Sequence, residues 1–108
     1  MDVPGSTMLE RGSDHLPTGR VLDPRPEGPY DDTFPLSGGT TTLLWPGALR
    51  LECHSDCRYA VLFDENAGAV CVEPQTGPPD GLNTAPDLVF PDRPLAARAE
   101  WSWSSAPG

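Results

Sequence analysis

Proline is the residue type that most restricts what this chain can fold into. The 108 residues include 14 prolines and 11 glycines. A proline has no backbone N–H to donate and costs about 3 kcal/mol inside a helix. Six prolines lie in residues 1–39 and six more in residues 74–94, so long helices are excluded from both segments. The rest of the sequence must supply most of the regular structure.

Residues 1–39 combine these prolines with little hydrophobic periodicity. Turn signals occur at residues 16–19, which read Leu-Pro-Thr-Gly, and at residues 23–29, which contain three prolines. This composition alone predicts loop or disorder. Within a larger fold, the same residues could form an extended edge chain that packs against a neighbour. We therefore expect a proline-rich, extended or irregular segment over residues 1–39.

From residue 40 onward the sequence has the patterns of β-strands. Residues 40–45 are β-branched, apolar or aromatic and are followed by a Pro-Gly turn signal. Residues 49–54 alternate apolar and polar side chains, which is the period of a half-buried strand. Residues 59–63 form a further strand with two distinct faces, and residues 64–68 have the composition of a hairpin loop. The short apolar run at residues 69–73 favours a strand buried on both faces.

The last strand has the clearest pattern in the chain. It follows a predicted long, ordered loop over residues 74–94, which holds at most a short strand at residues 88–90. Side chains alternate from residue 95 to residue 104, and Trp101 and Trp103 point to the same face. Two tryptophans on one face need a substantial partner sheet to cover them. We therefore expect an all-β fold of antiparallel strands that forms part of a large β-sandwich.

The charge balance restricts the partners that this chain can have. Sixteen acidic and seven basic residues give a net charge of −9. Such a chain repels nucleic acid and anionic membranes, so neither is expected as a partner. No run of about 18 apolar residues is present to span a bilayer. The N-terminus lacks the basic and apolar regions of a signal peptide, so we expect a cytoplasmic protein.

A group of potential metal ligands lies at residues 53–57, which read Cys-His-Ser-Asp-Cys. Thiolate and imidazole are ligands that suit zinc, but a structural zinc site normally needs four ligands. If this segment is a strand, Cys53 and His54 point to opposite faces and cannot bind the same ion. We therefore expect no metal site here. An odd number of cysteines in a chain without a signal peptide predicts reduced thiols instead.

Glu73 is the residue that the pattern alone singles out for chemistry. It follows four small or apolar residues and precedes Pro74, which keeps it in an extended conformation. A carboxylate at the end of a buried strand is desolvated, and this suits it to general base catalysis. The loop behind it carries Gln75, Asp80 and Asn83, which can hydrogen-bond a hydroxyl-rich ligand. The alternative is an exposed glutamate at a strand end, followed by a proline turn.

The same residues resemble the signature of a known enzyme family. Glu73-Pro74-Gln75-Thr76, followed by Pro79-Asp80 and by Asn83, is similar to the motif of the aldose 1-epimerase (galactose mutarotase) family. Upstream, Leu16-Pro17-Thr18-Gly19 is similar to the family's P-T-G turn. Asp31-Asp32-Thr33-Phe34 is similar to its D-x-x-F segment, and the last strand resembles the family's closing strand. The likeness covers nearly the whole chain.

The resemblance implies a galactose mutarotase-like supersandwich and a cofactor-free isomerase of carbohydrate metabolism. Such an enzyme interconverts the α and β anomers of a hexose such as glucose or galactose by opening the sugar ring. Glu73 would take the proton of the anomeric hydroxyl as general base. Asp31 would hydrogen-bond the sugar hydroxyls and orient the ring. Gln75 and Asn83 match motif positions, and we expect them to contact the sugar peripherally or to shape the loop.

The sequence departs from the family in its general acid. In the family this acid is a histidine within an H-x-Y-F-like segment upstream of the aspartate, and neither His15 nor His54 has that context. Because only 30 residues precede Asp31, we expect residues 1–108 to be the C-terminal part of a single, longer domain, with its active-site loop at residues 73–94. This chain alone is then expected to lack full activity. The alternative is a non-catalytic carbohydrate-binding remnant or a nonfunctional fragment of such an enzyme.

Overall fold

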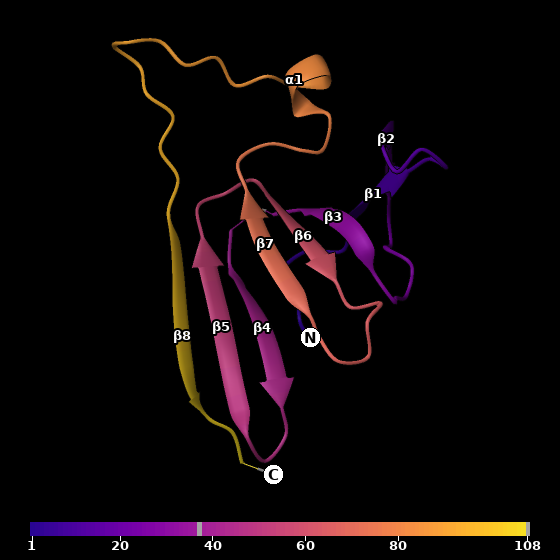
Figure 1. Ribbon diagram of the computed structural model, residues 1–108, viewed down its shortest axis with the longest axis vertical. Coiled ribbons are helices and arrows are strands. Elements are labelled where there is room, and N and C mark those ends of the chain that lie inside the picture. The colour runs from indigo at the N-terminus through magenta and orange to yellow at the C-terminus, as the bar shows by residue number, and fades with distance from the viewer. Residues whose placement is uncertain (37, 108) are drawn as a thin grey trace.

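Antiparallel strands dominate the structure, a computed structural model in which residues 1–36 and 38–107 are described. The only helix in this part of the chain is a single turn (Figure 1), and it is far too short to cross a membrane. The prediction of an antiparallel, all-β chain is therefore confirmed. In chain order the elements are β1 (Met8–Arg11), β2 (Pro17–Leu22), β3 (Asp31–Pro35), β4 (Thr40–Trp45), β5 (Leu49–Ser55), β6 (Tyr59–Phe63), β7 (Cys71–Gln75), α1 (Gly81–Thr84) and β8 (Ala99–Ser105).

The strands form one hairpin and two three-stranded sheets. β1 pairs with β2, and the two sheets have the strand orders β3-β6-β7 and β4-β5-β8. The hairpin of β4 and β5 therefore comes between β3 and its partner β6 in the sequence. A crossover of residues 76–98 joins β7 to β8, and Figure 1 shows it passing above both sheets before it descends into β8. Each three-stranded sheet thus contains one local hairpin and one strand from a distant part of the chain.

The hydrophobic core lies between the N-terminal segment and one face of the sheet β3-β6-β7. Phe34 and Leu62 are completely buried there, and Val3 and Met8 complete the buried cluster. Tyr30 meets Phe34 edge to face, with the ring centroids 5.1 Å apart. Burial of these apolar side chains is the main stabilising contribution in a chain of this size.

Residues 1–39 are more regular than their composition predicts, because they contain β1, β2 and β3. Asp2 and Thr42 also exchange two backbone hydrogen bonds, each of 2.8 Å. The prediction of an irregular segment misses these strands. β1 and β2 pair with each other as a hairpin, and β3 pairs with the distant β6. The alternative of an extended chain packed against a neighbour is closer to the structure.

The strands expected from residue 40 onward agree well with the structure. β4, β5 and β6 lie where the patterns place them, and residues 64–68 lie in the turn that joins β6 to β7. The last strand begins at Ala99, four residues later than the alternation from residue 95 predicts, and residues 95–98 lie in the crossover instead. In β5, Cys53 is buried and His54 is exposed, as the alternation predicts. Residues 88–90 do not form a strand, since the structure has only an isolated bridge between Phe90 and Arg93.

β7 differs from the predicted strand in both its bounds and its burial. The apolar run at residues 69–73 predicts a strand buried on both faces, whereas β7 begins at Cys71 and exposes both Cys71 and Glu73. Pro74 provides the physical reason. A proline cannot donate to a neighbouring strand, so within sheets it is confined to edge strands and bulges. Within the described residues β7 pairs only with β6, and it is therefore an edge strand.

Candidate functional site

The sheet β3-β6-β7 carries three of the four predicted site residues on one face. In this sheet Thr33 and Glu73 both pair with Val61, while Asp31 pairs with Phe63. Paired residues share a face and side chains alternate along a strand. The side chains of Asp31, Glu73 and Gln75 therefore leave the same face of the sheet. β6 lies between β3 and β7, so two strand spacings, about 10 Å, separate Asp31 from Glu73 across the sheet.

Glu73 does not have the buried position that the sequence predicts. It is the central residue of an edge strand, and its side chain is exposed to solvent. The desolvation that would suit a buried carboxylate to general base catalysis is therefore missing here. The alternative prediction, an exposed glutamate at a strand end followed by a proline turn, is correct about burial. It is wrong about position, because Glu73 lies within β7, which continues through Pro74 to Gln75.

Asp31 lies at a small cavity between the β1-β2 hairpin and the sheet β3-β6-β7. This hairpin cavity has a volume of about 220 Å³, which is below the roughly 300–1,000 Å³ typical of pockets for drug-sized ligands. Its polar groups come from β1 and β3 and from the turn between β1 and β2. The polar side chains that line it are Glu10, Arg11, His15, Asp31, Asp32 and Thr33.

An ion pair fixes the arrangement of the hairpin cavity. The Arg11 Nε donates to Asp32 Oδ1 at 3.0 Å, and Asp32 Oδ2 accepts the Asp31 backbone N–H at 3.1 Å. The Asp32 side chain is 8% exposed, whereas Asp31 is exposed. The neighbouring aspartates therefore have different roles: Asp32 joins β3 to β1, and Asp31 is free to meet a ligand. Asp31, the residue that the motif selects, is thus the more accessible of the two.

His15 and Arg11 are polar residues of this cavity that the sequence did not single out. Arg11 donates from a terminal guanidinium nitrogen to His15 Nδ1 at 2.8 Å. Because a guanidinium has no acceptor, Nδ1 must accept, and the ring proton then lies on Nε2. The sequence feature that could have pointed to His15 is the turn-forming composition of residues 12–16. In this turn Asp14 accepts the Leu16 backbone N–H at 3.1 Å. This turn places His15 in the same cavity as Asp31.

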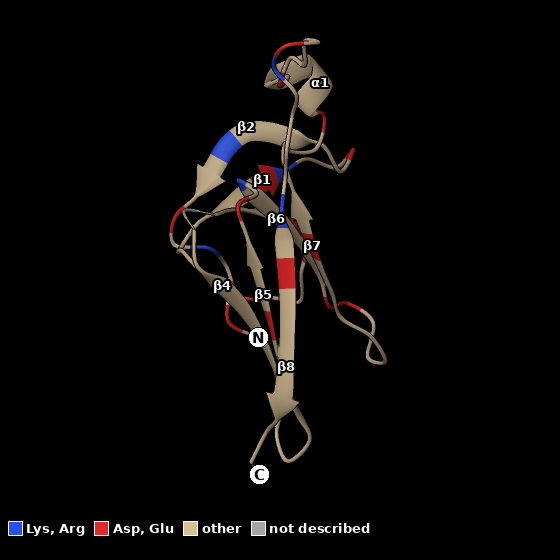
Figure 2. Ribbon diagram, turned by 90° about the vertical axis from the view of Figure 1, so that its left-hand side faces the viewer, with Lys and Arg blue, Asp and Glu red and all other residues tan. Residues whose placement is uncertain are grey.

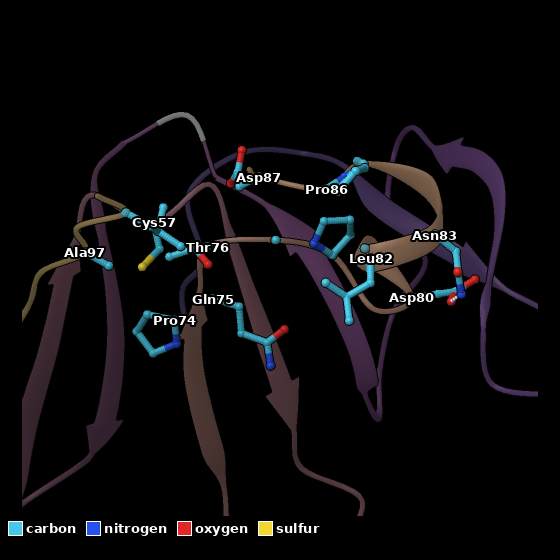
Figure 3. A pocket seen from close by; sticks show the side chains of 15 residues that line it. Cys57, Pro74, Gln75, Thr76, Asp80, Leu82, Asn83, Pro86, Asp87 and Ala97 are labelled. Atoms are coloured by element: carbon cyan, nitrogen blue, oxygen red, sulfur yellow. Dashed lines mark hydrogen bonds between the residues drawn. The ribbon is translucent and has the colours of Figure 1, made fainter. Parts of the chain in front are cut away.

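Gln75 and Asn83 line a different hollow, beneath the crossover (Figure 3). This crossover groove is open to solvent and has a volume of about 740 Å³. Asn83 Nδ2 donates to Asp80 Oδ1 at 2.6 Å, so its amide group helps to shape the loop. The structure thus brings Gln75 and Asn83 to one hollow but leaves Asp31 in another, while Glu73 is not among the residues that line either.

Polar contacts hold the middle and the C-terminal end of the crossover against the loop between β5 and β6. Arg58 forms an ion pair with Asp87 at 2.5 Å. At the C-terminal end, Asp56 accepts the Arg98 backbone N–H through its Oδ1 at 2.8 Å. Both ion-paired side chains are partly exposed, and exposed pairs of this kind contribute at most about 1 kcal/mol. The walls of the crossover groove are therefore held in place weakly.

The three cysteines differ in burial, and this predicts their reactivity. Burial raises the pKa of the Cys53 thiol, and the nearby Cys57 raises it further. A raised pKa lowers the thiolate fraction at any pH below it, and the thiolate is the reactive form. We expect iodoacetamide at pH 8 to modify exposed Cys71 fastest and Cys53 slowest of the three, measured by peptide mass spectrometry against time. Equal rates at Cys53 and Cys71 would contradict this ranking.

In the part of the chain that the structure describes, no group of three or more His, Cys, Asp or Glu side chains is placed to hold a metal ion. Cys53 and His54 lie on opposite faces of β5, as their spacing predicts.

No protein-family model, curated protein or solved structure matches this chain. What the site can do chemically therefore rests on its own residues. The carboxylates of Asp31 and Glu73 can accept hydrogen bonds or protons, and Arg11 and His15 can donate hydrogen bonds to a small polar ligand.

Proposed function

We propose that this chain belongs to an aldose 1-epimerase-like protein that acts on a free hexose such as glucose or galactose. In this proposal Glu73 is the general base that takes the proton of the anomeric hydroxyl. Asp31 accepts hydrogen bonds from the sugar hydroxyls and orients the ring. The sheet β3-β6-β7 would form part of the large β-sandwich that the resemblance implies.

One observation carries the proposal: Asp31 and Glu73, the residues chosen from the motif, leave the same face of one sheet. They lie 42 positions apart in the sequence, and the pairing of β3 and β7 with β6 brings them onto one surface. They are two strands apart and offset by two residues along the strands, about 12 Å in all, which leaves room for a ring-shaped ligand between them over Val61 and Phe63. Both side chains are exposed and therefore accessible to a ligand.

The activity of Glu73 can be tested by following the mutarotation of fresh α-D-glucose with polarimetry. We expect this chain to accelerate the reaction weakly, because a general acid or base typically contributes about 10²–10⁴-fold in rate and the family's acid histidine has no counterpart here. Glu73→Gln should return the rate to that of buffer. Glu27→Gln, at an exposed loop position, is the matched control and should leave the rate unchanged. Retained activity in Glu73→Gln would rule out the proposed role of Glu73.

A second candidate function is binding of a hexose without turnover. The exposed position of Glu73, outside the residues that line the hairpin cavity, favours this candidate. NMR titration with glucose separates the two functions. Binding without turnover predicts chemical-shift changes around Asp31 that Asp31→Asn removes, together with a mutarotation rate equal to buffer. Absence of both binding and acceleration would reject both functions.

A further inference from the structure

The outer edge of β8 is an unpaired strand edge. β8 pairs with β5 along one edge, and within residues 1–36 and 38–107 no strand pairs with the other. All of its residues are exposed, including Trp101 at 42% and Trp103 at 70%. A strand edge of this kind, without proline, lysine or a bulge to protect it, is a template for pairing with another strand.

Two backbone hydrogen bonds beside the β5-β8 ladder show which residues of β8 face this open edge. Ala106 donates its N–H to the Ala48 carbonyl at 3.3 Å, and the Arg98 carbonyl accepts from Asp56 at 3.2 Å. Antiparallel strands alternate hydrogen-bonded and non-hydrogen-bonded pairs. The even-numbered residues of β8 therefore bond to β5. The residues that direct their N–H and C=O groups outward are Ala99, Trp101, Trp103 and Ser105.

We propose that two copies of this chain pair antiparallel through their β8 edges, about a two-fold axis at Ser102. In this register Trp101 of one copy lies opposite Trp103 of the second copy, and Ala99 lies opposite Ser105. Every outward residue then bonds to an outward residue of the other copy through both its N–H and its C=O. Any shift along the strands leaves some outward residues unpaired. The two sheets β4-β5-β8 would join into one continuous sheet.

The side chains of β8 are self-complementary in the same register. Trp101 and Trp103 share one face of the sheet, so pairing sets two aromatic cross-strand pairs side by side on that face. Glu100 then lies opposite Ser104 of the second copy. A register centred on Glu100 would instead place two carboxylates opposite each other, which is unfavourable. The strand therefore favours a second copy in one particular alignment.

Charge directs the contact to this edge of the molecule. Each chain carries a net charge of −9, so two copies repel each other over most of their surface. Figure 2 views the molecule with β8 in front, where a single acidic band crosses the strand. This band is Glu100, whose carboxylate forms an ion pair with Arg98. The uncharged stretch from Trp101 to Ser105 is then the place where two copies approach most easily.

The association is tested by sedimentation equilibrium of the full chain over a range of concentrations. We expect the mass to rise from that of one chain to twice that value as the concentration increases. Ser105→Pro removes one outward N–H and none of the bonds to β5, so it should weaken the association at least tenfold while circular dichroism keeps the parent spectrum. A parent chain that remains monomeric at every concentration would overturn the proposal.

The register is tested by cross-linking in a chain that also carries Cys57→Ser and Cys71→Ser. At the two-fold axis, the two copies of Ser102 form a non-hydrogen-bonded pair with Cα atoms about 4.5 Å apart, which is within the range of a disulfide. Ser102→Cys should therefore give a covalent dimer on a non-reducing gel. Ser104→Cys, on the same face of the same strand, is the matched control and should not, since its two copies lie about 14 Å apart. Failure of Ser102→Cys to cross-link, or equal cross-linking of both variants, would overturn this register.

This inference is independent of the proposed function, because β8 belongs to a different sheet from Asp31 and Glu73. Ser105→Pro should weaken the association without changing the mutarotation rate. Conversely, Glu73→Gln lies outside the β8 edge and leaves the expected association unchanged. The failure of one proposal can therefore be distinguished from the failure of the other.

Discussion

Phe34→Ala is expected to destabilise this chain by about 3–5 kcal/mol, the usual cost of truncating a fully buried phenylalanine. Phe34 is completely buried in the core cluster with Leu62. Its loss leaves a cavity and removes the ring that Tyr30 meets edge to face at 5.1 Å. It also removes the ring over which the Arg25 guanidinium lies, 5.6 Å from the centroid. For a domain of this size the melting temperature should fall by about 15–25 °C, measured by circular dichroism.

Phe90→Ala is the matched control, because it makes the same chemical change at an exposed position. Phe90 is 45% exposed and its ring contacts the Arg93 guanidinium at 5.0 Å. Removal of this contact should cost less than about 1 kcal/mol. If Phe34→Ala melts within a few degrees of the parent chain, the core does not lie where the structure places it.

Asp32→Asn is expected to destabilise the chain by about 1–3 kcal/mol. Loss of one partner from a fully buried ion pair costs about 3–5 kcal/mol, but the Arg11 side chain is 32% exposed, and solvent reduces the cost. The asparagine must also turn one amide hydrogen toward a group that donates, because both carboxylate oxygens of Asp32 accept hydrogen bonds. Urea unfolding monitored by tryptophan fluorescence measures the change.

Asp31→Asn is the control for this prediction, because it makes the same change at the adjacent, exposed residue. We expect it to alter the free energy of unfolding by less than about 0.5 kcal/mol. Under the proposed function it should nevertheless reduce hexose binding. Equal destabilisation by both substitutions would mean that the two aspartates do not have separate structural and ligand-binding roles.

The strands that could be predicted from the sequence are those with a strong local pattern. β5 and β8 alternate side chains along most of their length, and β4 is rich in threonine and apolar residues. Of the strands that were missed, β1 and β2 pair with each other across a short turn, whereas β3 depends on a distant partner. β3 pairs with β6, so that Thr33 meets Val61, and no local pattern within a proline-rich segment reports such a contact.

In the candidate site, too, the sequence predicts what a local motif carries and misses what the three-dimensional arrangement decides. The motif selects Glu73 and Asp31 as candidates, but the chemistry of these two residues depends on burial and distance, which the sequence gives only indirectly. The apolar residues before Glu73 indicate a buried strand, whereas Pro74 limits β7 to an edge and leaves Glu73 exposed. That the two carboxylates share a face follows only from the strand order β3-β6-β7 and from the register of its pairs. His15 enters the hairpin cavity through the local turn at residues 12–16, but the sequence does not show that β3 lies opposite this turn.

The interleaved order of the strands has a consequence for how the chain reaches its folded state. The β4-β5 and β6-β7 hairpins join neighbouring strands, so each needs only a short loop to close. β8 instead must find β5 across an intervening hairpin and the crossover of residues 76–98. The chain loses conformational entropy when this long loop closes, before the hydrogen bonds between β5 and β8 form. Contacts between residues so far apart in the sequence slow folding. We therefore expect β8 to be the last strand to join its sheet, so that folding intermediates expose an edge of β5.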